Sequence, residues 1–219
     1  DMAAFGEADL VVLNGLGYDE WASGALANSS AGTSVIDVGE LTDAQDGDNP
    51  HLWYSPDAVQ AAAAALSAQL GEAAPEADDY LQARSDAWAA SLRPYRAELE
   101  RLHNLGAAAT VAATEPVADP LIEASGLRNA TPRGYTGAAA NEGEPAPADI
   151  AEFEALIDGG HIDALIYNTQ SAGPTAKRLR TLAEDRDVPV VEVTETIPAD
   201  ADGFVAWQVD QLRHLAETV

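Results

Sequence analysis

DALIYNTQSAGPTAKRLRTLAEDRDVPVVEV, residues 163–193, contains the clearest alternation of strand and helix patterns in the chain. An apolar run at its start, residues 163–167, predicts a buried strand, and residues 188–193 predict a second one. Between the two runs we expect a helix over residues 175–185. Strands of continuous apolar character that alternate with helices are typical of a parallel sheet covered on both faces. The stretch therefore predicts an α/β fold.

The same alternation extends through the second half of the chain. Its other expected elements are a strand over residues 107–113, helices over 119–125 and 147–157, and a final helix over 202–217. Gly126 follows the first of these helices and is suited to close it. The second half is thus predicted to form one parallel-sheet lobe.

The first half predicts a second, smaller lobe of the same kind. Residues 8–13 and 33–38 are apolar runs of strand length. A helix should begin near Ser55, because serine is a favoured N-cap and Pro56 suits the first helical position. The lobe should therefore also contain a parallel sheet with a helix against it.

A longer helix is predicted between the lobes, over residues 76–104. Its apolar side chains recur at helical spacings of three, four and seven residues and form one stripe: Leu81, Trp88, Leu92, Tyr95, Leu99 and Leu102. Pro94 interrupts the stripe and should kink the helix. At 1.5 Å per residue the helix would be about 40 Å long, which suits a strut. We therefore expect an N-terminal lobe at 1–75, a linking helix at 76–104 and a C-terminal lobe at 105–219.

Composition limits the classes of partner. The 219 residues include 37 acidic and 11 Lys or Arg side chains, for a formal charge of −26, so we expect no nucleic-acid partner. The absence of cysteine excludes disulfides and thiolate ligands. No apolar run is long enough to span a membrane, and no signal peptide is visible. Because a strand-like run follows Asp1 almost directly, we expect residues to be missing upstream.

Polar side chains follow the predicted strands where ligands of parallel sheets bind. Glu115 follows the strand over 107–113, Glu195 follows the strand over 188–193, and His51 lies in the loop after the strand over 33–38. Two carboxylates facing a dry cleft repel each other unless a cation lies between them. An imidazole with carboxylates and no sulfur suits Zn²⁺ or Mn²⁺. The sequence therefore predicts a divalent metal site at His51, Glu115 and Glu195.

Three other classes of function compete with a metal-binding protein. Gly15, Gly17 and Glu20 half-match a dinucleotide-binding turn, but the acidic residues there would repel a pyrophosphate. A hydrolase could use the two glutamates as acid and base, or use a metal with an open coordination position. The third class is an interaction module that binds a partner through its acidic surface.

The motifs together resemble the cluster A-I metal-binding receptors of ABC importers, the ZnuA/TroA-like family, and most closely its actinobacterial members. The similar segments fall in the family's order and span nearly the whole chain: ADLVVLNGLGYDEW (8–21), NPHLWYSPDAV (49–59), ATEPVADPLIEASGL (113–127), DALIYNTQSAGPTAKRL (163–179) and VPVVEVTETIP (188–198).

The resemblance assigns an order to the ligands. It implies that His51 is the second metal ligand, Glu115 the third and Glu195 the fourth, with Asn168 and Gln170 at most supporting them. Family members have a strand, a helix and a strand before the first matched segment, with a first ligand histidine just upstream of it. We therefore expect an incomplete N-terminal lobe in this chain and a lower metal affinity than four side-chain ligands give.

The resemblance also implies the function. We expect an extracytoplasmic substrate-binding protein, not an enzyme, that captures Zn²⁺ or Mn²⁺ as its transported ligand for the membrane permease of an ABC importer. A monomer that is periplasmic, secreted or lipid-anchored at the cell surface is implied, with a broader link to cell adhesion. The alternative is the metal-dependent hydrolase.

Overall fold

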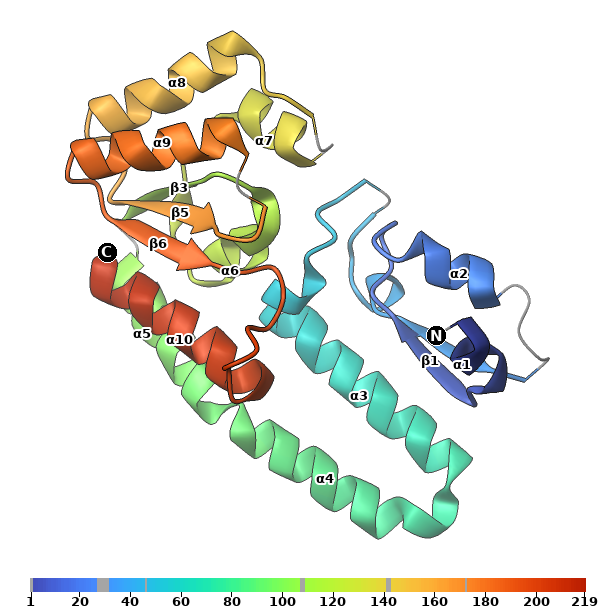
Figure 1. Cartoon of the computed structure of the whole chain (residues 1–219). Helices are drawn as coiled ribbons and strands as arrows, with labels where there is room; N and C mark the ends of the chain where they lie inside the picture. The colour runs from blue at the N-terminus through green and yellow to red at the C-terminus, as the bar shows by residue number, and fades with distance from the viewer. Residues whose placement is uncertain (1, 27–31, 46, 107–108, 141–142, 172) are drawn as a thin grey trace. The chain divides into compact units, whose positions relative to one another are not determined.

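The computed structural model of the chain describes residues 2–26, 32–45, 47–106, 109–140, 143–171 and 173–219. It divides into two compact units, Asp1–Ala90 and Ser91–Val219. Each unit contains a parallel sheet with helices packed against it, as Figure 1 shows. The predicted α/β fold with two parallel-sheet lobes is confirmed. The lobe boundaries at 75/76 and 104/105, and the role of the linking segment as a strut, remain predictions.

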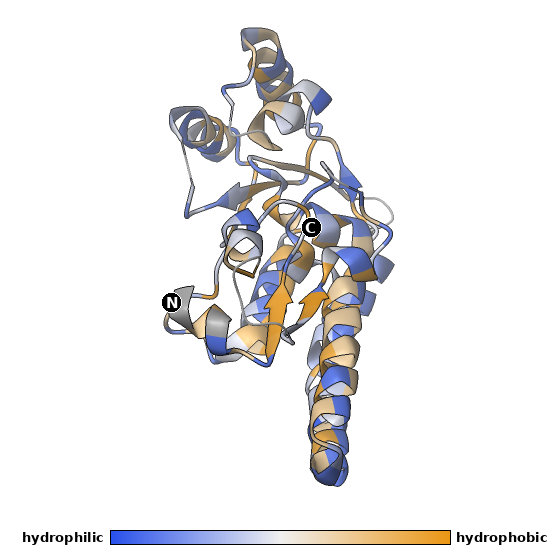
Figure 2. Ribbon diagram, turned by 90° about the vertical axis from the view of Figure 1, so that its right-hand side faces the viewer, coloured by the Kyte–Doolittle hydropathy of each residue, from blue (hydrophilic) through white to orange (hydrophobic). Residues whose placement is uncertain are grey.

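Unit 1 is built around a small parallel sheet. Strands β1 (Leu10–Leu13) and β2 (Ser34–Asp37) pair with Val11 opposite Val35. Its remaining elements are α1 (Met2–Glu7), α2 (Glu20–Leu26), the 3₁₀ turns η1 (Gly39–Leu41), η2 (Leu52–Tyr54) and η3 (Pro75–Ala77), and helices α3 (Pro56–Ala73) and α4 (Asp78–Ser91). Apolar residues gather on the two strands (Figure 2), where Val11, Leu13 and Ala22 of α2 form a buried cluster.

Helix α3 begins where the sequence predicts. Ser55 has extended backbone and its hydroxyl accepts a hydrogen bond from the N–H of Ala58 at 3.3 Å, while Pro56 occupies the first turn. Ser55 is therefore the N-cap of the helix. Pro56 costs the helix no hydrogen bond, because an N–H in the first turn has no partner within the helix. The predicted start of the helix is confirmed.

The helical stretch predicted over residues 76–104 is present as two helices. Helix α4 ends at Ser91 and helix α5 (Arg93–Gly106) follows after Leu92. Pro94 explains the interruption, because a proline ring clashes with the carbonyl four residues earlier and offers no N–H. The predicted stripe is buried at Leu92, between the helices, and at Tyr95 and Leu102 of α5. The break coincides with the boundary between the two units.

Unit 2 contains a four-stranded parallel sheet in the order β4-β3-β5-β6. The strands are β3 (Thr110–Ala113), β4 (Arg128–Asn129), β5 (Ala164–Asn168) and β6 (Val190–Val193). Its helical elements besides α5 are η4 (Pro116–Ala118), α6 (Asp119–Ala124), α7 (Arg133–Ala140), α8 (Pro147–Asp158), α9 (Pro174–Asp185) and α10 (Gly203–Thr218). Every residue of β3 and β5 is buried, as expected for strands covered on both faces.

Helices pack on both faces of this sheet. Figure 1 shows α8 and α9 on one face and α5 with α10 on the other. On the first face, Phe153 and Ile157 of α8 and Leu179 of α9 are fully buried against Leu165 of β5. The sheet is therefore a rigid base for the loops that leave its strands.

Some elements differ from the prediction. The strand predicted over 107–113 begins at Thr110, and residues 107–108 lie outside the described part of the chain. Helices α1, α2 and α7 and the two-residue strand β4 were not predicted. They are short, and α1, α2 and α7 each contain glycine, which lowers helix propensity. Within the described ranges, no helix combines the length and apolar character needed to cross a membrane.

Candidate metal-binding residues

Glu115 lies two residues after the end of β3 and caps the start of the turn η4. Its backbone is extended, with φ −154° and ψ 155°, and Pro116 behind it starts the turn. Asn168, the last residue of β5, donates from Nδ2 to Glu115 Oε2 at 2.9 Å. The hydroxyl of Ser171 also contacts Oε2. The carboxylate is therefore fixed by two side chains from the neighbouring strand and its loop.

Glu195 lies in the loop after β6, which is anchored on two sides. Before it, the Thr194 N–H donates to Gln211 Oε1 at 3.2 Å, and Trp207 Nε1 donates to Thr194 Oγ1 at 2.9 Å. After it, Thr196 and Gln170 exchange two hydrogen bonds of 2.9 Å. Glu195 is half-buried in this anchored loop.

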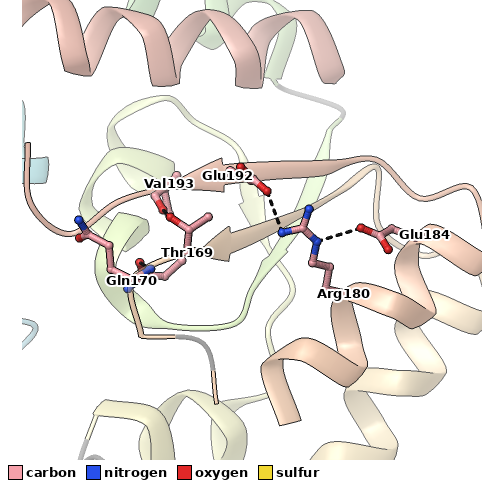
Figure 3. Close-up of polar contacts among 7 residues, drawn as sticks. Thr169, Gln170, Arg180, Glu184, Glu192 and Val193 are labelled. Atoms are coloured by element: carbon pink, nitrogen blue, oxygen red, sulfur yellow. Dashed lines mark hydrogen bonds and ion pairs between the residues drawn. The ribbon is translucent and has the colours of Figure 1, made fainter. Parts of the chain in front are cut away.

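The strand order places both glutamates at the same edge of the sheet. Strand β5 lies between β3 and β6, so Asn168 and Gln170 stand between the loops of Glu115 and Glu195. Figure 3 shows Gln170 and Val193 at the ends of β5 and β6, where Thr169 N–H donates to the Val193 carbonyl at 3.1 Å. In the same view Arg180 of α9 pairs with Glu184 on its own helix and with Glu192 of β6.

His51 belongs to unit 1, in the loop before η2. Asn49 Oδ1 accepts the backbone N–H of His51 at 3.0 Å and lies 2.6 Å from His51 Nδ1. Because a backbone N–H only donates, the Asn49 atom is an oxygen, and Nδ1 must carry the proton that faces it. The neutral ring then has its lone pair on Nε2, the tautomer that suits a metal ligand whose other nitrogen is hydrogen-bonded.

Aromatic rings and a backbone contact hold the His51 loop in place. The His51 ring packs edge-on against Trp53 at 5.2 Å and Tyr18 at 6.3 Å between centroids. Asn14 Nδ2 donates to the carbonyl of Pro50 at 2.8 Å and ties this loop to the end of β1. The imidazole is therefore oriented by its surroundings within unit 1.

The three candidate ligands are divided between the units, with His51 in unit 1 and both glutamates in unit 2. Within the described residues, no group of three His, Asp or Glu side chains is close enough to hold a metal ion. Because each unit is described by itself, the convergence of His51 with Glu115 and Glu195 remains a prediction.

The other three histidines have local surroundings of a different kind. His103 packs against Gly126, where an added Cβ would lie 2.9 Å from its Nδ1, and His161 is similarly close to Gly159. His214 is exposed and lies 3.7 Å from Asp210 on its own helix. These contacts favour structural or surface roles for them.

Ser171 and Tyr135 are neighbours of Glu115 that sequence reasoning missed. Burial, together with the negative charges of Glu115 and Glu144, raises the pKa of Tyr135 to about 12. Tyr135 is on α7, a helix that the sequence did not predict, so nothing in the sequence linked it to Glu115. Ser171 could have been found, because it lies in the loop after β5 with Asn168 and Gln170.

Comparison with protein families identifies the chain. The family model of ZnuA, the periplasmic component A of the zinc-uptake complex, matches residues 1–218. The chain therefore belongs to this family of metal-capturing substrate-binding proteins, which confirms the resemblance seen in its sequence motifs. The family consists of periplasmic binding proteins rather than enzymes. No curated protein sequence matches the chain.

Solved structures share the fold over nearly the whole chain. The substrate-binding protein FpvC from Pseudomonas aeruginosa, in complex with Mn²⁺, has a TM-score of 0.78 and 21% identity, covering 99% of this chain and 81% of its own. The periplasmic zinc-binding protein TroA from Treponema pallidum has a TM-score of 0.79 and 17% identity, covering 100% and 83%. A periplasmic metal-binding protein from Candidatus Liberibacter asiaticus has a TM-score of 0.77 and 14% identity, covering 100% and 83%.

Proposed function

We propose that this chain captures Zn²⁺ or Mn²⁺ outside the cytoplasm and delivers the ion to the membrane permease of an ABC importer. The observation that carries the proposal is the anchored edge of the unit 2 sheet. There Glu115 and Glu195 follow the strands on either side of β5. Asn168 at the end of β5 bonds to the carboxylate of Glu115, and Gln170 in the loop after β5 bonds to the loop of Glu195. Family membership supports the same function.

His51, Glu115 and Glu195 are the proposed protein ligands of the ion. Carboxylates at one edge repel each other, and a divalent cation replaces this repulsion with attraction. His51 would add a neutral imidazole through Nε2, the nitrogen left with the lone pair by the contact to Asn49. The set contains no sulfur, which suits both of the proposed ions.

The protein acts by capture without chemistry, as a monomer. Residues 76–104 join the lobes at 1–75 and 105–219 as a strut, so capture requires only a small change of shape. Release occurs when the importer disturbs the site. Because metal ligands must be deprotonated to bind, affinity for the ion falls in acid.

The location follows from the same family. The chain works extracytoplasmically, in a periplasm or at the cell surface as a secreted or lipid-anchored protein. Exposure at a cell surface would also allow a part in cell adhesion. No observation favours the metal-dependent hydrolase. Turnover of ester, phosphate or glycoside substrates by the zinc-loaded protein would support that alternative.

Competition with a fluorescent chelator tests the proposal. We expect the wild-type chain to bind one Zn²⁺ or Mn²⁺. Each of the variants His51→Ala, Glu115→Ala and Glu195→Ala should lower the affinity for the preferred ion by about 100-fold or more. His214→Ala and Glu217→Ala remove an exposed histidine and an exposed glutamate and serve as matched controls. Unchanged affinity in all three ligand variants would contradict the site, and a wild-type chain that binds neither ion would contradict the function.

A further inference from the structure

The carboxylate of Glu115 is held by a closed triangle of side chains. Asn168 Nδ2 donates to Glu115 Oε2 at 2.9 Å and lies 2.6 Å from Ser171 Oγ. The Ser171 hydroxyl donates its hydrogen to the same Glu115 oxygen. Both bonds therefore end on Oε2.

The backbone fixes the orientation of this triangle. Asn168 is 2% exposed at the end of β5, and its Oδ1 accepts the backbone N–H of Gln170 at 3.0 Å. A backbone N–H requires an acceptor, so the oxygen of the amide must face Gln170 and the nitrogen must face Glu115. Asn168 is thereby held as a donor to Glu115.

Two hydrogen bonds to one oxygen decide how the carboxylate can meet an ion. Asn168 and Ser171 both donate to Oε2, and neither of these bonds ends on Oε1. Of the two carboxylate oxygens, Oε1 is therefore the one that offers its lone pairs to an ion more readily. We propose that Asn168 and Ser171 are positioning residues that make Glu115 a one-oxygen ligand through Oε1 and thereby bias the site toward Zn²⁺ over Mn²⁺. This inference rests on the proposed function, because it requires Glu115 to be a ligand.

Coordination chemistry links the number of oxygens to the choice of ion. Zn²⁺ is satisfied by about four donors in a tetrahedron, so single-oxygen carboxylates serve it well. Mn²⁺ is suited by a larger, oxygen-rich shell of about six donors. A glutamate restricted to one oxygen withholds a donor that Mn²⁺ could use and Zn²⁺ does not need.

Ser171→Ala is the variant that tests this, because Ser171 is exposed and its loss leaves Asn168 on the strand. Dissociation constants for Zn²⁺ and Mn²⁺ would be measured by chelator competition and compared as a ratio. Ser171→Thr retains the hydroxyl and should keep the wild-type ratio. Thr181→Ala removes a hydroxyl that donates within α9 to the carbonyl of Lys177 at 3.1 Å, and is the control.

We expect Ser171→Ala to weaken Zn²⁺ binding roughly tenfold and Mn²⁺ binding much less, so that the preference for Zn²⁺ narrows. If Ser171→Ala leaves the ratio unchanged while Glu115→Ala abolishes binding, the inference fails and the proposed function stands. If the wild-type chain binds neither ion, both fail together. Asn168→Asp, which places an acceptor against Glu115, should shift the ratio in the same direction as Ser171→Ala.

Discussion

Gln170 and Thr196 bond to each other twice across the ends of two strands. Gln170 Oε1 accepts the Thr196 N–H, and Gln170 Nε2 donates to Thr196 Oγ1, both at 2.9 Å. The pair joins the loop after β5 to the loop after β6, 26 residues later. Because Glu195 immediately precedes Thr196, the glutamine fixes the backbone beside a proposed ligand without being one.

Removal of this pair should weaken metal binding while every proposed ligand remains. We predict that Gln170→Ala raises the Zn²⁺ dissociation constant roughly tenfold, the usual cost of losing a partner that orients a ligand. Isothermal titration calorimetry measures the change. Gln82→Ala is the control, since Gln82 is exposed and bonds to Asp86 on its own helix at 2.9 Å. Equal affinities for the Gln170 and Gln82 variants would show that the pair does not orient Glu195.

Asp119, at the start of α6, should make the stability of unit 2 depend on pH. The pKa of Asp119 is raised from 3.8 to about 6, mainly by burial. The hydrogen bond from Asn129 lowers this pKa, and the negative charge of Glu123 raises it slightly. The folded chain therefore holds this proton more tightly than the unfolded chain, and the free energy of unfolding falls as the pH rises from about 4 to 6. Above pH 6 the ionised Asp119 should lower the free energy of unfolding by roughly 1 to 3 kcal/mol.

Asp119→Asn removes the titrating group. Comparison with wild type therefore separates the effect of Asp119 from that of the other acidic groups. Urea unfolding of both proteins at several pH values between 4 and 7 gives the difference in unfolding free energy. We expect the asparagine variant to gain stability relative to wild type as the pH rises through this window. A difference that stays constant with pH would contradict the role of Asp119.

Helix α5 offers two leucines for a matched test of packing. Leu102 is fully buried, whereas Leu105 on the same helix is 49% exposed. We predict that Leu102→Ala lowers the free energy of unfolding by about 2–5 kcal/mol, because it leaves a cavity in the core. Leu105→Ala should change it by no more than about 0.5 kcal/mol. Chemical denaturation followed by circular dichroism measures both, and similar losses would contradict the packing of α5 on the body of unit 2.

The sequence predicted the parts of the fold that depend on local pattern. The strands now seen as β5 and β6 were visible because continuous apolar runs need cover on both faces, and α3 was visible through Ser55 and Pro56. Helix α7 was not, because it is short and contains Gly134 and Gly137, and its place depends on burying Tyr135 against Phe153. Such packing has no signature in the local sequence.

The candidate site was predictable to the same extent. Glu115 and Glu195 were predicted as ligands because polar residues after parallel strands lie at one edge. The strand order of unit 2 places both loops at that edge, and their role as ligands remains a prediction. The Asn168–Ser171 triangle was not predicted, because it depends on the conformation of a loop 53 residues from Glu115 in sequence. That His51 joins the two glutamates remains a prediction, because it concerns both units together.

The most direct test is an anomalous difference map from crystals grown with Zn²⁺ and measured on both sides of the zinc absorption edge. We predict one strong peak within about 2.0–2.2 Å of His51 Nε2, Glu115 Oε1 and a carboxylate oxygen of Glu195. A peak bound by other residues, or zinc held by one unit alone, would contradict it.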